Sequence, residues 1–453
     1  MRKIEPPPTF RDVSIRENGE RLFQLALKSD FNELINTVNE KYYYWDKVKY
    51  LQLPKDIKPE EVWLIAKLRR VNSPFKISFG NHSFFWFLNS HIQELLHLFD
   101  LNIGGSLESR SVIPREDRDR YLISSIMEEA IASSQIEGAV TTRKQAKEML
   151  RKNKIPKTKD ERMIYNNYMT IQQILDVKDQ HITVDKILQI HKLVTADTLS
   201  SREEEGNFRN SNDVNVVDVV DGEIVYSPPD FNEIDLLIDE LCIFFNGESD
   251  KTFIHPIIKG CIIHFMIGYI HPFVDGNGRT ARALFYWYLL KRGYWLTEYL
   301  SISKLILRSK AQYARAFQYT EIDDHDLTYF IKYKLRTMNL AFEALRDYIQ
   351  RKIEEKRQIA KFMRLKSIND RQALILKWVY EDENLILTVK EVETRLVISN
   401  QTARTDLQKL VRLGYLEALK LDLKTEAFIK GDKFDTLINP TSKIIQSDLF
   451  DSD

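Results

Sequence analysis

The pattern of apolar and polar positions repeats every three to four residues along most of this chain. Glycine and proline, which interrupt helices, are scarce, with 15 and 13 copies among 453 residues. A period of this length places the apolar side chains on one face of an α-helix. Helices are therefore expected over about 118–138, 144–152 and 160–177, and again from the residues after 230 to about 354. The predicted fold class is mainly α.

One stretch departs from this pattern and has the composition of β-structure. Within residues 213–230 (DVNVVDVVDGEIVYSPPD), two β-rich runs flank Asp221-Gly222. An Asp-Gly pair between such runs favours the tight turn of a β-hairpin. The sequence therefore predicts one hairpin within a largely helical domain.

The last part of the chain, about 365–432, follows a different order. Three helical patterns, RQALILKWVYE, TVKEVETRL and SNQTARTDLQKLVRLG, precede two strand-like runs, LEALKL and EAFIK. Helices and a hairpin in this order resemble a winged helix-turn-helix. Residues 433–453 are expected to form a tail. The third helix separates an apolar from a polar face, with Ala403, Leu407, Leu410 and Val411 on the first and Asn400, Gln401, Arg404, Thr405 and Gln408 on the second.

Composition narrows the function only slightly. Basic and acidic residues number 66 each, so net charge favours neither nucleic acid nor membrane as a partner. The start of the chain lacks the apolar core of a signal peptide, and no stretch is apolar for long enough to span a bilayer, so a cytoplasmic protein is expected. Cys242 and Cys261 lie in apolar runs, as buried thiols do. Residues 1–113, with the aromatic cluster YYYW at 42–45, are expected to supply packed core, and their role is unassigned.

The stretch HPFVDGNGRTARALFYWYLLKRG, residues 271–293, carries the chemistry. An apolar helix is predicted up to His271, a tight loop over 275–278, and a second helix from about Arg279. The loop then lies at a helix N-terminus, where backbone N–H groups and the helix dipole favour an anion. Arg279 and Arg282 are three positions apart and share one face of the first turn. These features predict a cradle for a polyphosphate.

Two further side chains of this stretch suit phosphate chemistry. Asp275 offers a carboxylate oxygen of the kind that Mg²⁺ takes while it keeps phosphate and water ligands. His271 can accept a proton near neutral pH. A calcium loop fits poorly, because Thr280 and Tyr286 stand where such a loop needs glycine and glutamate. The loop also lacks the lysine of a Walker A motif, and a purely structural loop gives two arginines and a histidine no purpose.

These residues resemble a known family. HPFVDGNGRTAR matches the Fic signature, HPFx(D/E)GNGRxxR, at nine fixed or restricted positions of twelve, and the similarity covers about residues 117–350. The resemblance implies a helical Fic core over about 114–355, with ATP as substrate and Mg²⁺ as cofactor. It implies that His271 deprotonates a target hydroxyl, that Asp275 holds Mg²⁺, and that attack falls on the α-phosphorus. The phosphates are implied to be bound by Gly276, Asn277, Gly278, Arg279 and Arg282, with the two arginines on the outer ones.

The resemblance also gives roles to the hairpin and to one tyrosine. The hairpin at 213–230 is similar to the family's flap, whose edge strand pairs with the target segment and sets its hydroxyl against His271. An ordinary hairpin that covers core is the alternative. Tyr313 falls where these proteins place a tyrosine near the nucleotide, although here Ala314 replaces the aromatic residue that often follows it. The implied flap edge consists of Val214, Asn215, Val216 and Val217.

A second motif, SSQIEG at 133–138, matches the family's inhibitory pattern (S/T)xxxE(G/N). Ser133 and Glu137 are four positions apart and share one helix face. The resemblance implies that this helix, about 118–138, is inhibitory, with Glu137 in a bidentate pair with Arg282 at the place of the γ-phosphate. The alternative is a solvated glutamate near a helix end.

One more histidine invites a metal interpretation. His264 lies seven residues before His271 and could share its helix face. A zinc site needs at least a third ligand, and none is evident. A packed or hydrogen-bonded histidine is therefore expected.

The function predicted from these motifs is transfer of AMP from ATP to Ser, Thr or Tyr hydroxyls of target proteins, the enzyme itself included, under inhibition by Glu137. Two alternatives stay open. One is a DNA-binding regulator with the Fic core as sensor, and the other is removal of AMP on the same fold. Winged helices bind proteins as well as DNA, so both partners, and a homodimer, are among the expectations. Local basic residues, offset by acidic ones, bear on the DNA alternative: Lys390, Arg395, Arg404, Lys409 and Arg412 against Glu391, Glu393, Asp406 and Glu417.

Overall fold

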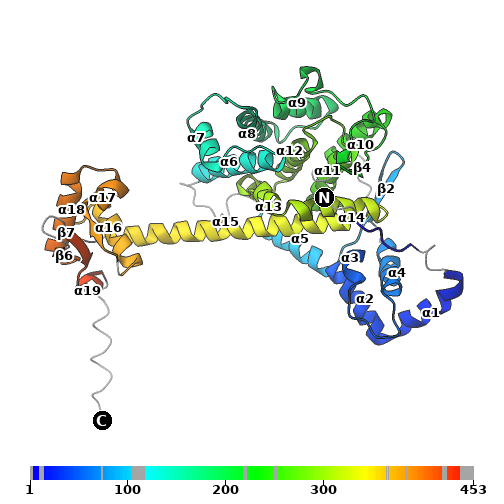
Figure 1. The fold of residues 1–453 in the computed structure, drawn as a ribbon, viewed down its shortest axis with the longest axis horizontal. Coiled ribbons are helices and arrows are strands. Elements are labelled where there is room, and N and C mark those ends of the chain that lie inside the picture. Colours follow the sequence, from blue (N-terminus) through cyan, green and yellow to red (C-terminus); the bar gives the residue numbers. More distant parts are fainter. Residues whose placement is uncertain are drawn as a thin grey trace, which may run out of the picture. The chain divides into compact units, whose positions relative to one another are not determined.

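The computed structural model describes the chain in several stretches and shows a mainly α-helical protein, as the apolar period predicts (Figure 1). The internal contacts divide the chain into two units, residues 1–345 and 346–453. Among the predicted features, the turn residue Asp221 lies outside the described residues, as does the part of the predicted tail, 433–453, beyond residue 438. The start of that segment is not a free tail, because Phe434 and Ile438 are buried in a core cluster. None of the described helices is long and apolar enough to cross a lipid bilayer. The backbone is described at 4–9, 15–72, 75–104, 118–217, 222–247, 252–363, 365, 367–383, 385–420 and 426–438.

The first unit begins with a helical region that contains the aromatic cluster. Tyr42, Tyr44 and Trp45 are buried, as expected for core residues. Buried polar contacts join this region to the later part of the unit, since Lys67 pairs with Asp323 at 2.5 Å. Its elements are α1 (Ile15–Leu27), α2 (Ser29–Lys41), α3 (Trp45–Val48), α4 (Pro59–Val71), β1 (Phe75–Phe79), β2 (His82–Trp86) and α5 (Ser90–Asn102).

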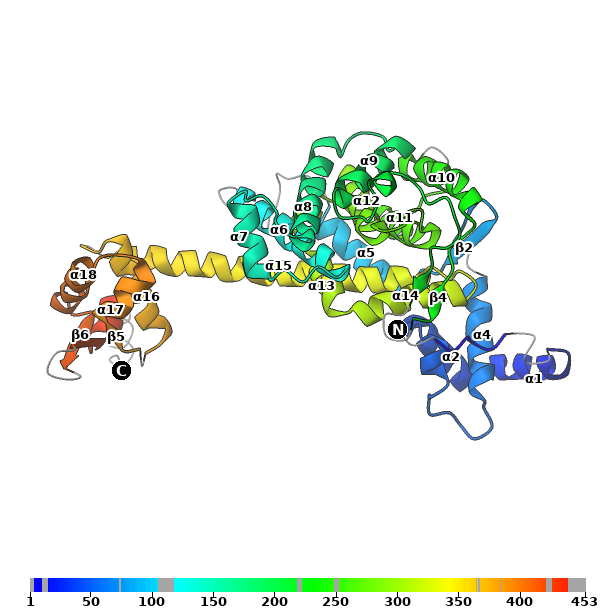
Figure 2. The same ribbon diagram turned by 45° about the horizontal axis from the view of Figure 1, so that its top comes forward.

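Two adjacent helices, α11 and α12, form the centre of the first unit and lie side by side in both views (Figure 1, Figure 2). Almost every residue of α11 is buried, as is typical of a helix that is apolar all round. The surrounding elements are α6 (Arg118–Ile136), α7 (Arg143–Arg151), α8 (Lys159–Val177), α9 (Val184–Thr195), η2 (Arg202–Glu204), η3 (Phe231–Glu233), α10 (Ile234–Asn246), α11 (Pro256–Ile270), α12 (Asn277–Lys291), η4 (Trp295–Tyr299), α13 (Ile302–Arg308), α14 (Lys310–Ile322) and α15 (Thr328–Met363).

The β-rich stretch forms an antiparallel pair, β3 (Val216–Val217) and β4 (Ile224–Tyr226). Val216 pairs with Tyr226, and the register shifts before the next pair. Gly222 has a φ of +73°, a conformation that glycine adopts without steric cost. Val214 and Asn215, which the sequence assigns to the flap edge, precede the strand and are not part of it.

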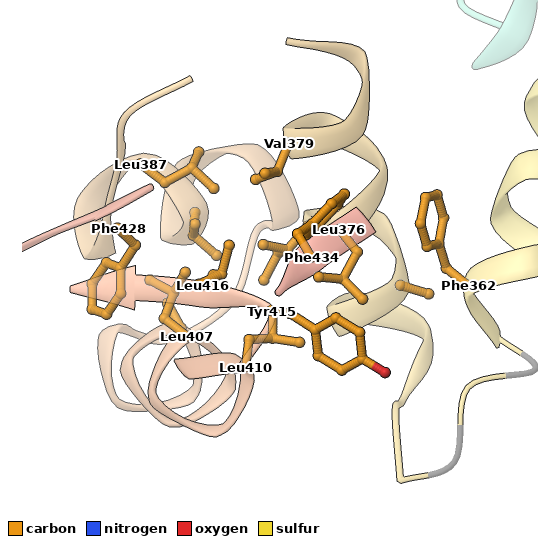
Figure 3. Packing of buried hydrophobic residues seen from close by; sticks show 14 of the residues in the cluster. Phe362, Leu376, Val379, Leu387, Leu407, Leu410, Tyr415, Leu416, Phe428 and Phe434 are labelled. Carbon is orange, nitrogen blue, oxygen red and sulfur yellow. The ribbon is translucent and has the colours of Figure 1, made fainter. Parts of the chain in front are cut away.

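The second unit has its own apolar core (Figure 3). Its sheet is antiparallel, in the order β5-β7-β6, and Phe362 near the end of α15 packs into the core. This order of helices and strands supports the winged helix-turn-helix, which stays a prediction. The elements after α15 are α16 (Asp370–Glu381), β5 (Leu387–Thr388), α17 (Val389–Leu396), α18 (Asn400–Arg412), β6 (Leu416–Lys420), β7 (Glu426–Lys430) and α19 (Phe434–Ile438).

Candidate active site

The loop between α11 and α12 is held in an unusual backbone conformation. His271 follows α11 with a φ of 49°, in the left-handed region that residues with a side chain rarely adopt. Gly276 has a φ of 88°, and a Cβ there would lie 2.6 Å from Cγ2 of Thr195. α12 begins at Asn277, two residues before the predicted start at Arg279. Strained residues of this kind gather at functional sites, because the surrounding structure must hold them in place.

The side chain of His271 is oriented as a proton acceptor. Its Nδ1 lies 3.2 Å from the carbonyl oxygen of Gly268, which can only accept a hydrogen bond. Nδ1 must therefore carry the proton, and in the neutral ring Nε2 keeps its lone pair. Burial lowers the pKa of His271 below its usual value, so the neutral form prevails at pH 7.

His191 of α9 supports this loop, and the sequence analysis did not identify it. Its ring stacks on Phe273 with the centroids 3.6 Å apart. Nδ1 accepts a hydrogen bond from the backbone N–H of Gly206 at 3.0 Å, so Nε2 carries the proton and donates to the carbonyl oxygen of Asp275 at 2.8 Å. Burial lowers the pKa of His191 to about 4. The apolar period around His191 indicates only a buried helix face and gave no signal of this contact.

Arg209 is a second supporting residue that the sequence analysis missed. Its Nε donates to the carbonyl oxygen of His271 at 3.0 Å, and Nη2 donates to that of Pro229 at 2.6 Å. The backbone N–H of Arg209 also donates to the carbonyl oxygen of Pro272 at 2.8 Å. One buried guanidinium thus ties the loop to the segment that follows the hairpin. A single arginine in a polar stretch belongs to no sequence pattern that predicts such a contact.

Asn277 and Arg279 use their side chains to hold the loop. The amide of Asn277 bonds both the N–H and the carbonyl oxygen of Phe273, at 3.0 and 2.7 Å. Arg279 is 1% exposed and donates from Nη1 to the carbonyl oxygen of Val194 at 2.7 Å. Its Nη2 lies 3.7 Å from Oδ1 of Asp275. The side chain of Arg279 is thus engaged in holding the loop, and the binding of the outer phosphates by both arginines stays a prediction.

Arg282 contacts both residues of the proposed inhibitory motif. Its Nε donates to Oγ of Ser133 at 2.8 Å, and its Nη2 donates to the carbonyl oxygen of Ser133 at 3.0 Å and to Oε1 of Glu137 at 2.8 Å. The guanidinium is thus shared, whereas the sequence suggested a bidentate pair with Glu137 alone. Burial disfavours the charge of Arg282, but Glu137, Tyr313 and Glu129 together outweigh burial and raise the pKa of the guanidinium. Nη1 has no hydrogen-bond partner among the described atoms.

The carboxylate of Glu137 lies directly over the first turn of α12. A Cβ built on Gly278 would lie 2.2 Å from Oε1 of Glu137, so the two residues are in close contact. Lys310 fixes this end of α6 by donating from Nζ to the carbonyl oxygens of Gln135 and Ile136, at 2.9 and 3.1 Å. A negative charge at a helix N-terminus is stabilised by the dipole and by free N–H groups. Glu137 therefore occupies the position at which a phosphate is expected.

His264 is a packed, hydrogen-bonded histidine, as the sequence analysis favoured. Its Nε2 lies 2.8 Å from the hydroxyl of Tyr313, and its Nδ1 lies 3.3 Å from Nζ of Lys334. The described residues contain no group of three His, Cys, Asp or Glu side chains that could hold a metal ion. Burial raises the pKa of the Tyr313 hydroxyl, and this side chain lies close enough to Arg282 and Glu137 to feel both charges.

The carboxylate of Asp275 is placed at the loop surface. Its side chain is 54% exposed, and Oδ1 accepts from the N–H of Gly276 at 2.5 Å. Mg²⁺ commonly uses one or two carboxylates and takes its other ligands from phosphates and water. One exposed carboxylate beside an anion-binding helix start fits an ion that arrives with a polyphosphate.

The hairpin presents a partly exposed strand. Val217 is 50% exposed, while Val216, Val214 and Asn215 are half-buried. Among the described strands β3 pairs only with β4, so its outer edge has no strand partner there. Such an edge can accept an added strand. The role of these residues as a flap stays a prediction.

This fold and site define a class of protein. A helical domain that sets a proton-accepting imidazole, an exposed carboxylate and a helix N-terminus around one loop is suited to transfer of a phosphorus-containing group. Residues 181–289 match the model of the Fic/DOC family, so the chain contains a Fic/DOC domain. The match includes His271 to Arg282, and it leaves Ser133 and Glu137 outside.

Individual proteins resemble the same part of the chain. Protein adenylyltransferase Fic of Drosophila melanogaster is 35% identical over 132 residues, which are 29% of this chain and 23% of that protein. Protein adenylyltransferase Fic of Nematostella vectensis is 34% identical over 138 residues, 30% of this chain and 28% of that protein. The chain thus spans about a quarter of the length of these relatives. A solved Fic family protein from Desulfovibrio desulfuricans is 20% identical, with a TM-score of 0.47, and the match covers 76% of this chain and 97% of that one.

Proposed function

We propose that this protein is an adenylyltransferase that moves AMP from ATP onto a hydroxyl of a target protein. The observation that carries the proposal is the loop geometry, in which Nε2 of His271 keeps its lone pair beside the N-terminus of α12. The matches to protein adenylyltransferases named Fic support it. A base and an anion site on one short loop are what this reaction needs.

The chemistry follows from the residues around the loop. The phosphates of ATP bind at the backbone of Gly276 to Gly278, and Arg282 holds the outer phosphate. His271 accepts the proton of the target hydroxyl through Nε2 as the oxygen attacks the α-phosphorus. A bond forms between that oxygen and the α-phosphorus, the bond to the oxygen bridging the β-phosphorus breaks, and pyrophosphate leaves. His191 and Arg209 keep the loop in register for this step.

Asp275 is the residue that we propose to hold Mg²⁺ against the phosphates. The ion supplies charge neutralisation when it is bound. Asp275 would hold the ion from the loop surface, where its Oδ1 lies 3.7 Å from Nη2 of Arg279. A protein target, or a second copy of this chain, approaches along the edge of β3 at Val214, Asn215, Val216 and Val217.

The ion pair between Glu137 and Arg282 supports self-inhibition. The carboxylate takes a hydrogen bond from the guanidinium and lies against Gly278, within the space that an outer phosphate needs. ATP must then bind with its phosphates displaced, and a displacement of about 1 Å can cost on the order of 10²-fold in rate. We propose that the resting enzyme has low activity for this reason.

The test uses the position of the label in ATP. Purified protein is incubated with a cell lysate, Mg²⁺ and ATP labelled at the α- or the γ-phosphate, and the labelled proteins are identified by mass analysis. The proposal expects label on protein from α-labelled ATP only. Label from γ-labelled ATP would indicate a kinase, and release of AMP from an already modified protein without any transfer would favour the reverse reaction.

A second candidate function concerns the second unit. The polar face of α18, Asn400, Gln401, Arg404, Thr405 and Gln408, is exposed. One of the acidic residues set against DNA binding, Asp406, is buried and pairs with Arg371 at 2.7 Å, so it does not face this surface. Glu391 pairs with Arg395, which engages one acidic and one basic residue. We propose DNA as the alternative partner of this face. Binding to duplex DNA that weakens with added salt and in the Arg404→Ala variant would support this proposal. No binding to duplex DNA would favour a protein partner instead.

A further inference from the structure

A polar pocket of about 400 Å³ lies outside the phosphate site but close to it. Its walls are the end of β4 and the residues that follow it, 225–229, together with His82, Tyr269, Glu321, Ile322 and His325. Tyr269 is two residues before His271, and its carbonyl oxygen accepts a hydrogen bond from the hydroxyl of Tyr226 at 2.8 Å. The pocket is therefore bordered by the hairpin on one side and by the end of α11 on another.

Most polar groups of this pocket are paired with one another. The hydroxyl of Tyr269 lies 2.9 Å from Nδ1 of His82, and Nε2 of His82 lies 3.1 Å from Glu233. Nδ1 of His325 lies 3.2 Å from the carbonyl oxygen of Ser83. Both ring nitrogens of His82 are thus in use. Burial lowers the pKa of His325, so its neutral form prevails at pH 7.

Glu321, at the end of α14, differs from these groups. It has no hydrogen-bond or ion-pair partner within the described part of the chain, and no lysine or arginine lines the pocket. Burial raises the pKa of its carboxyl to about 8. A carboxyl withdrawn from water without a counter-charge is costly to ionise, and a cation placed beside it removes that cost. The mechanism at His271 makes no use of Glu321.

We propose that this pocket receives a lysine or arginine side chain of the target protein, a few residues from the hydroxyl that is modified. The inference rests on the proposed adenylyl transfer and names a feature of its substrate. The rings of Tyr226 and Tyr269 and the two prolines, Pro228 and Pro229, provide walls for the aliphatic stem, and Glu321 pairs with the charged end. An acidic side chain is disfavoured, because the pocket offers its charge no cationic partner and Glu321 supplies none.

The test measures substrate preference in the Glu137→Gly variant of the full chain. A peptide library with a fixed Ser, Thr or Tyr and randomised flanks is labelled from α-labelled ATP. The library should show lysine and arginine enriched at one flanking position. In a Glu321→Gln variant, labelling of the selected basic peptide should fall about tenfold, since a charged hydrogen bond is lost. The same peptide with alanine at that position should be labelled equally by both variants. Glu321→Lys should reverse the preference toward Asp or Glu.

A matched control separates this result from general damage. Glu298 is also half-buried with a raised pKa, but it pairs with Lys178 and does not line the pocket. Glu298→Gln should leave the basic preference unchanged. A preference for lysine or arginine that survives Glu321→Gln would overturn the inference, while the proposed function would stand. The same conclusion follows if lysate proteins are labelled but the labelled peptides show no preference for a basic residue. If neither proteins nor peptides are labelled, the proposed function fails and the inference with it.

Discussion

The two units of this chain bury different kinds of side chain. In the first unit, charged groups lie deep in the protein, among them Arg70, Glu129, Lys259, Arg279, Arg282 and Lys334. In the described residues of the second unit, the buried polar side chains are those of Gln372 and Asp406, and Asp406 is paired with Arg371. The rest of that core is apolar (Figure 3).

This difference indicates that the first unit carries the catalytic site and that the core of the second unit serves stability. Burial of a charge lowers stability unless partners compensate it, so such groups persist mainly where a function needs them. The first unit keeps incompletely bonded guanidiniums at Arg279 and Arg282, while the second unit has no unbonded buried side-chain atom among its described residues. Substitutions at the charged loop should therefore change catalysis, and substitutions in the apolar core should change stability alone.

The largest effect is expected at His271. His271→Ala removes the proton acceptor and should lower AMP transfer by about 10²–10⁴-fold. Binding of ATP should be retained, because the imidazole faces the incoming hydroxyl and not the phosphates. Transfer and binding are measured with α-labelled ATP and by calorimetry in the Glu137→Gly background. Equal transfer by the two proteins would remove His271 from the mechanism.

The next largest effect is expected at Asp275. Asp275→Ala should lower transfer on the order of 10²-fold and abolish the dependence on Mg²⁺, because the carboxylate that orients the ion is lost. Transfer is measured across a Mg²⁺ titration. A normal Mg²⁺ dependence in the variant would show that Asp275 is structural.

His191 should have a smaller effect on rate and a distinct effect on acid stability. The native pKa is about 4, while the unfolded value is about 6.5. Between these pH values the unfolded state binds more protons, so stability falls as the pH drops from about 6.5 toward 4, by at most about 3 kcal/mol. In His191→Gln, where one amide replaces both ring nitrogens, this loss should be missing. The free energy of unfolding is measured with urea at several pH values for the wild type and for His191→Gln. An equal loss of stability in both proteins as the pH falls would contradict the assignment.

The smallest effect on activity is expected in the second unit. Leu407 is completely buried in its core, and Leu407→Ala should destabilise that unit by about 2–5 kcal/mol. Transfer by the first unit should stay unchanged. Thermal unfolding and label incorporation are measured on the same samples. A large loss of transfer would show that the two units depend on one another.

The residues differ in how far the sequence could predict them. The apolar period predicted the helices, and the Asp-Gly pair predicted the hairpin, because both are local signals. The motif brought His271, Asp275 and Arg282 together, since they lie within one short segment. His191 and Arg209 act on that segment from elsewhere in the chain, and no local pattern marks a contact formed by tertiary packing. The interaction of Arg282 with both the hydroxyl and the carbonyl oxygen of Ser133 was hidden for the same reason.

The extent of the second unit was also set by packing rather than by pattern. The sequence placed its start near residue 365, where the helical pattern changes. The structure adds Phe362 of α15 to its core, and the contacts of the unit begin at residue 346. Residues before 365 thus contribute to the second unit, and a truncation of α15 ahead of Phe362 would remove a residue of its core.

Transfer by Glu137→Gly tests the central claim most directly. Incorporation of label from α-labelled ATP is compared for the wild type, Glu137→Gly, Glu137→Gln and the double variant Glu137→Gly with Arg282→Ala. Gln135→Gly, at the same end of α6, controls for the effect of glycine on the helix. Glu137→Gly should raise transfer on the order of 10²-fold. Glu137→Gln should raise it less, since the amide keeps the bulk and one acceptor, and the double variant should lose the gain. A folded Glu137→Gly protein no faster than the wild type, or a Gln135→Gly protein equally fast, would contradict the account.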